Sequence, residues 1–142
     1  MTQSENNLPS TGKMIRRSLM RQCPRCANRR AWFTSWFKQG ERCIGCGIKR
    51  TRDTDGHELG SMTVASVLNI VLIMAAIGIA IALTAPDVPV LTLYIVLASA
   101  ALVFPVLTWP VTHTLWMAID LAARPMDAEE IAEAQAWLAN QS

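Results

Sequence analysis

Positive charge is nearly absent from the second half of this 142-residue chain. Residues 1–60 hold twelve of the 13 Lys and Arg against five acidic residues, whereas residues 61–142 hold one base, Arg124, against six acids. The two parts therefore carry net charges of +7 and −5, and the overall +2 hides a basic head joined to an apolar body. This division argues against one ordinary globular domain.

Charged residues are also missing from two long apolar runs, residues 61–84 and 88–109. At about 1.5 Å per residue, the first run spans about 36 Å and exceeds the roughly 30 Å hydrocarbon core of a bilayer. The second is also long enough, although Pro89 and Pro105 predict a late start and a kink. Neither run has the polar face that a helix of a soluble bundle needs. The short connection predicts an antiparallel transmembrane hairpin over residues 61–123, with the second helix continuing beyond its span.

No apolar run precedes residue 61, which argues against a signal peptide, and residues 1–20 are polar and basic enough to predict a disordered N-terminus. Lys49, Arg50 and Arg52 lie close to the first predicted span, whereas the connection at 84–88 has no Lys or Arg. Basic residues beside a span favour the cytoplasmic side. We therefore expect a multi-pass protein of the cell (inner) membrane with both termini in the cytoplasm.

Cysteine is scarce, but the four residues present form two Cys-x-x-Cys pairs, Cys23/Cys26 and Cys43/Cys46. In a reducing cytosol, thiols with this spacing are metal ligands more often than disulfides. The spacing predicts a β-hairpin zinc ribbon over residues 21–50, in which two turns bind one structural zinc ion through four thiolates. Iron in the same geometry and thiol-disulfide exchange are the alternatives. Residues 51–60 are expected to be a linker.

The second cysteine turn contains glycine and the first does not. Gly45 and Gly47 allow the second turn to adopt positive φ angles. Ala27 stands in the first turn at a position where a glycine would be convenient. We therefore expect Asn28 or local strain to help close the first turn.

Aromatic residues are few, yet four of them lie between basic residues in the stretch RRAWFTSWFK of the ribbon. A surface of this kind is typical of single-stranded nucleic-acid binders and also of the membrane interface, where Trp lies at headgroup depth and Arg contacts lipid phosphate. A ribbon about ten residues from a span favours an interfacial, packing or partner-binding role, and no RNA-binding module signature accompanies it. The residues concerned are Trp32, Phe33, Trp36, Phe37, Arg29 and Arg30.

Three stretches together resemble a bacterial family known as domain of unknown function 983, in its actinobacterial form. They are RQCPRCANRRAWFTSWFKQGERCIGCGI, LGSMTVASVLNIV and FPVLTWPVTHTLWMAIDLAARPMD, within residues 14–127. The resemblance implies a two-span membrane protein with an N-terminal zinc ribbon and a loose association with the biogenesis of membrane complexes, some of them respiratory. The sequence departs from the family at Thr112 or His113, where a basic residue often stands.

The stretch after the second span contains the remaining candidate functional residues. Trp109 and Trp116 lie seven residues apart on one helical face and suit the headgroup region. His113 is a candidate proton carrier or accessory ligand, although an interfacial histidine bonded to lipid or Thr is the simpler interpretation because no carboxylate lies one turn away. Asp120 is the other candidate, and its spacing from Arg124 predicts a modest surface ion pair.

Asn69 is the one strongly polar side chain within the spans, and an amide at that depth should seek a partner. Tyr94 and Ser99 of the second span are available, and so is a second protomer. Small residues around Gly78 would let a neighbouring helix approach closely. We therefore expect self-association or docking against a larger membrane protein.

Residues 124–142 predict a short amphipathic tail helix. Asp127 and Glu130 have the spacing of a capping box, and the apolar stripe that follows is too short to be stable without a docking surface.

No catalytic motif is recognisable in the sequence, which has no phosphate-binding loop and no carboxylate pair within a span. We therefore expect a non-enzymatic accessory or assembly protein of a membrane complex. Its partners would be the bilayer and a membrane protein or a second copy, with no small-molecule substrate. A membrane-tethered nucleic-acid binder and a thiol-redox or metal-handling protein are the alternatives.

Overall fold

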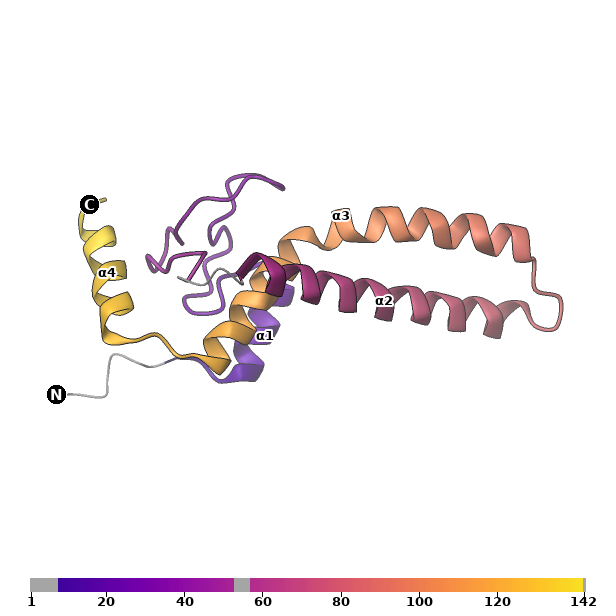
Figure 1. The fold of residues 1–142 in the computed structure, drawn as a ribbon, viewed down its shortest axis with the longest axis horizontal. Coiled ribbons are helices and arrows are strands. Elements are labelled where there is room, and N and C mark those ends of the chain that lie inside the picture. Colours follow the sequence, from indigo (N-terminus) through magenta and orange to yellow (C-terminus); the bar gives the residue numbers. More distant parts are fainter. Residues whose placement is uncertain (1–7, 53–56, 142) are drawn as a thin grey trace.

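The computed structural model describes residues 8–52 and 57–141, and this part of the chain contains four helices. Figure 1 shows two long helices side by side as a hairpin, with everything else gathered at the end away from the hairpin turn. The helices are α1 (Thr11–Leu19), α2 (His57–Thr84), α3 (Val90–Ala123) and α4 (Ala128–Ala139).

Helices α2 and α3 confirm the predicted apolar pair, because both are long and apolar enough to cross a membrane. α2 begins at His57, so the predicted linker over 51–60 is shorter than expected, and its residues 53–56 lie outside the described residues. α3 begins directly after Pro89 and ends at Ala123, as predicted. Figure 1 shows α3 changing direction in the orange part of its course, where two prolines, Pro105 and Pro110, lie inside the helix.

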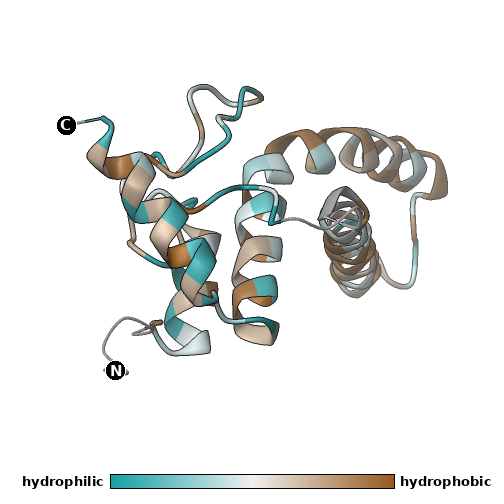
Figure 2. Cartoon of the chain, turned by 60° about the vertical axis from the view of Figure 1, so that its left-hand side comes forward, coloured by the Kyte–Doolittle hydropathy of each residue, from teal (hydrophilic) through white to brown (hydrophobic). Residues whose placement is uncertain are grey.

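The side chains of α2 and α3 separate into a narrow seam and a broad exposed face. Half-buried residues such as Leu68, Leu72, Leu97 and Phe104 recur at helical spacing along the two helices. The outward side chains are exposed although they are apolar, and Leu83 reaches 80% exposure. Figure 2 shows the hydrophobic colour along both helices and the hydrophilic colour mainly at the other end of the molecule. Because the most apolar window of each helix is 0% buried, neither behaves as the core helix of a globular protein.

Helix α1 corrects the prediction of a disordered N-terminus over residues 1–20. Residues Thr11–Leu19 are helical, while residues 1–7 lie outside the described residues. A helix this short depends on tertiary packing. That packing comes from Met14 and Ser18, which lie one turn apart and are buried on the last part of α3.

The segment over residues 21–50, called the cysteine ribbon below, contains no strand in the described structure, so the predicted β-hairpin is wrong. Two isolated bridge pairs are present, Phe33 with Gln39 and Arg42 with Lys49. Within the first pair the backbone closes a tight turn, because the amides of both Thr34 and Ser35 donate to the carbonyl of Lys38. The chain between the cysteine pairs is therefore a turn-rich loop and not a ladder.

Helix α4 confirms the predicted tail helix. The Asp127 carboxylate accepts a hydrogen bond from the Glu130 amide at 2.8 Å, and the Glu130 side chain accepts one from the Asp127 amide at 3.3 Å, which completes the capping box. Ile131 and Ala134 of its apolar stripe are buried.

One buried apolar cluster joins α1, the cysteine ribbon, the end of α3 and α4. Its members include Met14, Trp32, Ile48, Met117 and Ile131. The cluster lies at the end of the hairpin opposite the turn, so it fixes the cysteine ribbon at one end of the two long helices.

Candidate metal centre

The first cysteine turn is closed by two backbone hydrogen bonds. The Cys23 amide donates to the Asn28 carbonyl at 2.9 Å, and the Ala27 amide donates to the Cys23 carbonyl at 2.9 Å. Ala27 has a φ of 61°, a left-handed conformation that costs about 1–2 kcal/mol for a residue with a Cβ. The expected local strain in this turn is therefore present at Ala27. Arg17 of α1 supports the turn by donating to the carbonyls of Pro24 and Arg25 at 3.2 and 2.9 Å.

The second turn repeats the same bonding pattern. The Cys43 amide donates to the Ile48 carbonyl at 2.9 Å, and the Gly47 amide donates to the Cys43 carbonyl at 2.8 Å. Gly47 has a φ of 69° and corresponds to Ala27 of the first turn. It is also the point where α4 docks, because a Cβ on Gly47 would overlap the carbonyl of Ala134.

Gly45 does not have the predicted positive φ, so that expectation is wrong. Gly45 leaves no room for a side chain, because an added Cβ would lie 2.9 Å from the side-chain nitrogen Nδ2 of Asn28 and 3.0 Å from the Cys26 sulfur. Gly45 therefore lets the two turns approach each other.

The two turns bring all four sulfur atoms together, as the sequence predicted. The Sγ atoms of Cys23, Cys26, Cys43 and Cys46 lie within 4.8 Å of one another, and none of the four forms a disulfide. The Cys23–Cys46 and Cys26–Cys43 distances are both 3.7 Å. A tetrahedral ion with Zn–S bonds near 2.3 Å requires sulfur atoms about 3.8 Å apart. Two of the sulfur pairs thus have the spacing that a tetrahedral ion requires, and the group as a whole could hold one metal ion.

The pKa values of the thiols show why this cluster suits a cation. Hydrogen bonding to Cys26 and the other thiols, together with burial, raises the pKa of Cys23. Hydrogen bonds from Cys23 and the other thiols lower the pKa of Cys26. Four thiolates this close together repel one another, so some sulfurs hold protons when no cation balances them. A bound divalent ion removes that conflict, because every ligand then binds as a thiolate.

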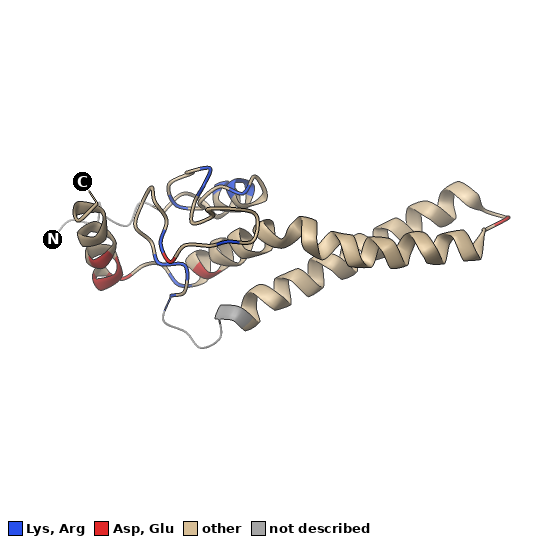
Figure 3. Ribbon diagram, turned by 90° about the horizontal axis from the view of Figure 1, so that it is seen from above, with Lys and Arg blue, Asp and Glu red and all other residues tan. Residues whose placement is uncertain are grey.

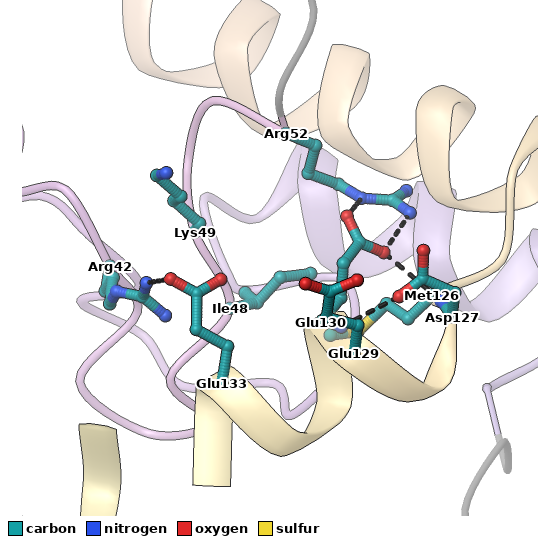
Figure 4. A pocket seen from close by; sticks show the side chains of 9 residues that line it. All are labelled: Arg42, Ile48, Lys49, Arg52, Met126, Asp127, Glu129, Glu130 and Glu133. Atoms are coloured by element: carbon teal, nitrogen blue, oxygen red, sulfur yellow. Dashed lines mark hydrogen bonds and ion pairs between the residues drawn. The ribbon is translucent and has the colours of Figure 1, made fainter. Parts of the chain in front are cut away.

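A buried arginine, which sequence reasoning missed, connects this centre to the helices. The side chain of Arg52 is 7% exposed and forms ion pairs with Glu130 of α4 at 2.6 Å and with Asp120 of α3 at 3.1 Å. It also donates to the carbonyls of Arg124 at 2.6 Å and Pro125 at 3.4 Å. Figure 4 shows the guanidinium facing the Glu130 carboxylate. The hydrogen bond from Arg52 lowers the pKa of Glu130.

A second arginine attaches α4 to the cysteine ribbon. Arg42 forms an ion pair with Glu133 and donates to the Gly47 carbonyl at 3.2 Å. Both arginines line a pocket of about 250 Å³ between the ribbon and α4, which Figure 4 shows with Ile48 at its centre. The sequence signal for this docking was the excess of base in the first 60 residues and of acid after residue 60.

The four ribbon aromatics divide into two pairs. Trp32 and Phe33 are buried at 2% and 8% exposure, so of the interfacial, packing and partner-binding roles expected for them their side chains take the packing role in the core. Trp36 and Phe37 lie at the exposed tip of the loop and contact α3. Their neighbours Arg29 and Arg30 are exposed.

The contact between the loop tip and α3 follows from a proline. The Trp36 indole donates to the Val106 carbonyl at 3.0 Å. In a regular helix the amide of residue 110 would bond this carbonyl, but Pro110 has no N–H. The indole therefore satisfies a carbonyl that the helix leaves open. The Phe37 ring lies 6.4 Å from the Trp109 ring, which extends the same contact.

The predicted polar residues of α3 are more buried than expected. Asp120 and Arg124 form the predicted pair at 3.1 Å, but the Asp120 side chain is 8% exposed, so this is not a surface pair. His113 is 6% exposed and its ring lies 4.5 Å from the Trp109 ring. Trp116 is half-buried and its ring occupies the space where Gly60 of α2 has no side chain. A proton-transfer role for His113 stays a prediction.

Asn69 has no hydrogen-bond partner on the other helix among the described residues. Its Oδ1 is buried without a hydrogen bond from any described residue, and Ser99 donates instead to the Ile95 carbonyl at 2.8 Å. Of the two partners left open by the sequence, the other helix supplies none among the described residues. A bond to a second protomer or another membrane protein stays a prediction.

Comparison with protein-family models, with curated proteins and with solved structures gives no match for this chain. The fold and the site themselves define a class of protein. It is a hairpin of two helices, each long and apolar enough to cross a membrane, which carries at one end a four-cysteine group able to bind a metal ion.

Proposed function

We propose that the chain is a non-enzymatic accessory or assembly protein of a bacterial membrane complex. In this proposal α2 and α3 cross the cell (inner) membrane, both termini are cytoplasmic, and structural zinc stabilises the cysteine ribbon as a recognition surface. The family resemblance to domain of unknown function 983 remains part of the proposal, and it favours a respiratory complex as partner.

The distribution of exposed apolar and charged residues supports the membrane orientation. The outward faces of α2 and α3 are apolar and exposed, so lipid is the environment that would cover them at least cost. Figure 3 shows the Lys and Arg of the described residues around the cysteine ribbon, whereas Asp87 at the hairpin turn is acidic. Basic residues at one end of a short hairpin favour placing that end in the cytoplasm.

The observation that carries the adaptor proposal is the fixed attachment of the cysteine ribbon to the hairpin. Arg52, two residues after the ribbon, bonds α3 and α4. Trp36 joins the ribbon's tip to α3. α1, directly before the ribbon, is held to α3 because Thr114 donates to the Ser18 carbonyl at 2.9 Å. A metal centre on a flexible tether would sample many positions. This attachment instead holds one surface of the ribbon at a constant height above the two long helices, which suits the docking of a membrane partner.

The exposed faces of the hairpin support an additional contact within the membrane. Gly78 is exposed, and an added Cβ there would meet nothing within 4 Å, so a neighbouring helix can approach its backbone closely. The buried Oδ1 of Asn69, which no described residue satisfies, lies in the same helix. Asn69 and Gly78 lie nine residues apart, on opposite faces of α2, so we expect a membrane-protein partner or a second copy to contact the helix at Gly78.

Zinc is the metal that we propose for the four-cysteine group. A closed shell of four thiolates leaves no open position for a water or a substrate, which favours a structural role. A ribbon of about thirty residues also buries too little apolar surface to fold alone, and metal binding supplies the missing free energy. Iron in the same geometry would give coloured protein, and a thiol-redox role would require the cysteines to cycle between oxidised and reduced forms in cells.

The experiment that tests the adaptor role is affinity purification of the full-length protein after extraction in a mild detergent. We expect a larger membrane protein to co-purify in stoichiometric amount with the wild type and to be lost in Cys43→Ser/Cys46→Ser. A matched Lys13→Gln/Arg16→Gln variant, changed on the exposed face of α1, should retain the partner. If the wild type purifies alone from native membranes at several detergent strengths, the adaptor role is wrong.

A further inference from the structure

An open pocket of about 630 Å³ lies on the cysteine ribbon beside the loop tip; it contains none of the four cysteines and shares only Arg42 with the pocket where α4 docks. Arginines contribute much of its lining, through Arg21, Arg29, Arg30 and Arg42, and none of the described residues that line it is acidic. The aromatic residues Trp32, Phe33 and Trp36 also line the pocket. A cavity lined by several cationic donors and by no carboxylate among the described residues favours an anion with several oxygen atoms.

The donors around this pocket are mostly unused. Arg29 and Arg30 are exposed and form no ion pair with any described residue, whereas Arg42 is already paired with Glu133. The Nε atom of Arg21 and the indole Nε1 of Trp32 are both buried and lack a hydrogen-bond partner in the described structure. A buried donor without a partner costs about 1–3 kcal/mol, so a bound acceptor would remove a real penalty.

Arg21 adopts a backbone conformation that its residue type disfavours. Its φ is 58°, at a helix C-terminus where glycine is the usual residue, and the amides of Arg21 and Gln22 close the turn by donating to the carbonyls of Ser18 and Arg17. Its guanidinium carbon lies 4.3 Å from the centroid of the Trp36 ring, which fixes it at the pocket. An arginine kept in a position suited to glycine points to a role for its side chain that glycine could not perform.

The pocket also lies at a defined height along the hairpin. Trp36, which lines it, bonds the Val106 carbonyl of α3. Val106 is sixteen residues from the start of α3, or roughly 24 Å along the helix, and Trp109 is roughly 28 Å along it. With a hydrocarbon core about 30 Å thick starting at the hairpin turn, the loop tip meets α3 where hydrocarbon gives way to headgroups.

We propose that this pocket binds the phosphate of an anionic membrane lipid, with Arg29, Arg30 and Arg21 contacting its oxygens and Trp36 lying at headgroup depth. The site anchors the cysteine ribbon to the cytoplasmic leaflet. It rests on the membrane orientation proposed above but not on the adaptor role, since lipid binding and partner capture are measured separately.

The test uses the full-length protein in an uncharged detergent, titrated with phosphatidylglycerol and followed by native mass spectrometry. We expect one lipid per chain at saturation, with phosphatidylcholine of the same chain length binding at least tenfold more weakly. Arg29→Gln/Arg30→Gln should weaken phosphatidylglycerol binding at least tenfold. The matched variant Lys13→Gln/Arg16→Gln, with the same loss of charge on exposed α1 residues outside the pocket, should change it less than twofold.

Arg21→Gly separates binding from folding. Glycine suits the backbone at this position, so the helical circular dichroism and the metal content should stay at the wild-type level while lipid binding falls at least fivefold. Equal losses in the two double variants would overturn the proposal in favour of diffuse charge attraction. Competition by inorganic phosphate at concentrations close to those of the lipid would identify a free phosphate site, and tighter, Arg29/Arg30-dependent binding of a single-stranded oligonucleotide would identify a nucleic-acid site. Either result would overturn the lipid assignment.

Discussion

Arg52→Gln should detach α4 from the rest of the molecule. The guanidinium of Arg52 contacts two carboxylates, Glu130 at 2.6 Å and Asp120 at 3.1 Å, and is 7% exposed. The shorter glutamine side chain cannot reach both. Among the described residues, Asp120, at 8% exposure, would keep only Arg124 as an ionic partner.

The expected magnitude follows from the burial of the pair. Removing one partner of a buried ion pair costs about 3–5 kcal/mol. Since the Glu130 side chain is 29% exposed, water screens part of its interaction, and the lower limit of that range applies. A change of about 3 kcal/mol corresponds to roughly a hundredfold change in the opening equilibrium of α4.

Hydrogen exchange measured by mass spectrometry on the full-length protein in detergent tests this prediction. Amides of α4 should exchange roughly a hundredfold faster in Arg52→Gln, whereas those in the middle of α2 should keep their wild-type rate. Arg29→Gln, which removes an exposed arginine without an ion pair among the described residues, is the matched control. Glu130→Gln keeps the capping box, because glutamine can still accept the Asp127 amide hydrogen bond. The Arg52→Gln/Glu130→Gln double variant should lose less α4 stability than the sum of the losses in the two single variants. Unchanged α4 protection in Arg52→Gln would refute the reasoning.

Three further predictions follow from the site. Gly47→Ala should accelerate metal release to a chelator by at least tenfold, because the residue has a φ of 69° and a Cβ would overlap the Ala134 carbonyl, whereas Ala27→Gly in the equivalent position should change it little. Acidification should release α4, because Arg52 holds the pKa of Glu130 below its usual value of 4.5. The stabilisation from Glu130 is complete above the pKa that Glu130 has in the unfolded chain, and it is lost as the pH falls through the lower pKa of Glu130 in the folded protein. Hydrogen exchange of the α4 amides, corrected for the intrinsic exchange rates, would show this loss. Trp36→Phe should lower the free energy of opening the loop tip by about 1–2 kcal/mol, because the Val106 carbonyl loses its donor, as exchange of the ribbon amides would show.

Each of these predictions has its own control. Faster metal release in Ala27→Gly than in Gly47→Ala would contradict the assignment of strain and docking to the second turn. In Glu130→Gln, the α4 amides should be less protected from exchange at neutral pH, and this protection should depend little on pH. An acid transition that is unchanged in this variant would show that another carboxylate causes the transition. Trp137→Phe, at a half-buried α4 residue whose indole makes no hydrogen bond to a described residue, should leave the loop tip unaffected.

Helices α2, α3 and α4 and the sulfur cluster were predictable because their signals are local. Uncharged runs long enough to cross a bilayer, the capping box at Asp127 and two Cys-x-x-Cys pairs each depend on neighbouring residues alone. The prolines predicted the late start of α3 for the same reason. Even the strained Ala27 was foreseeable, because the two cysteine turns share one spacing and only one of them has glycine at that position.

The contacts between distant segments were not predictable in the same way. α1 forms because Met14 and Ser18 are buried on α3, and nothing in its own short sequence shows that partner. The expected β-hairpin is wrong because Trp32 and Phe33 turn into the core and Trp36 turns toward α3, so the side chains do not pair across two strands. Arg52 was assigned to membrane topology from its sequence position, and its buried carboxylate partners became visible only in three dimensions.

Metal analysis of the purified full-length protein tests the central claim most directly. The sulfur geometry predicts close to one zinc ion per chain in the wild type and none in a variant with all four cysteines changed to serine, whose cysteine ribbon and α4 should lose their protection from hydrogen exchange while α2 and α3 keep theirs. Wild-type protein that is folded without any bound metal, or a serine variant that retains a protected ribbon, would contradict the account.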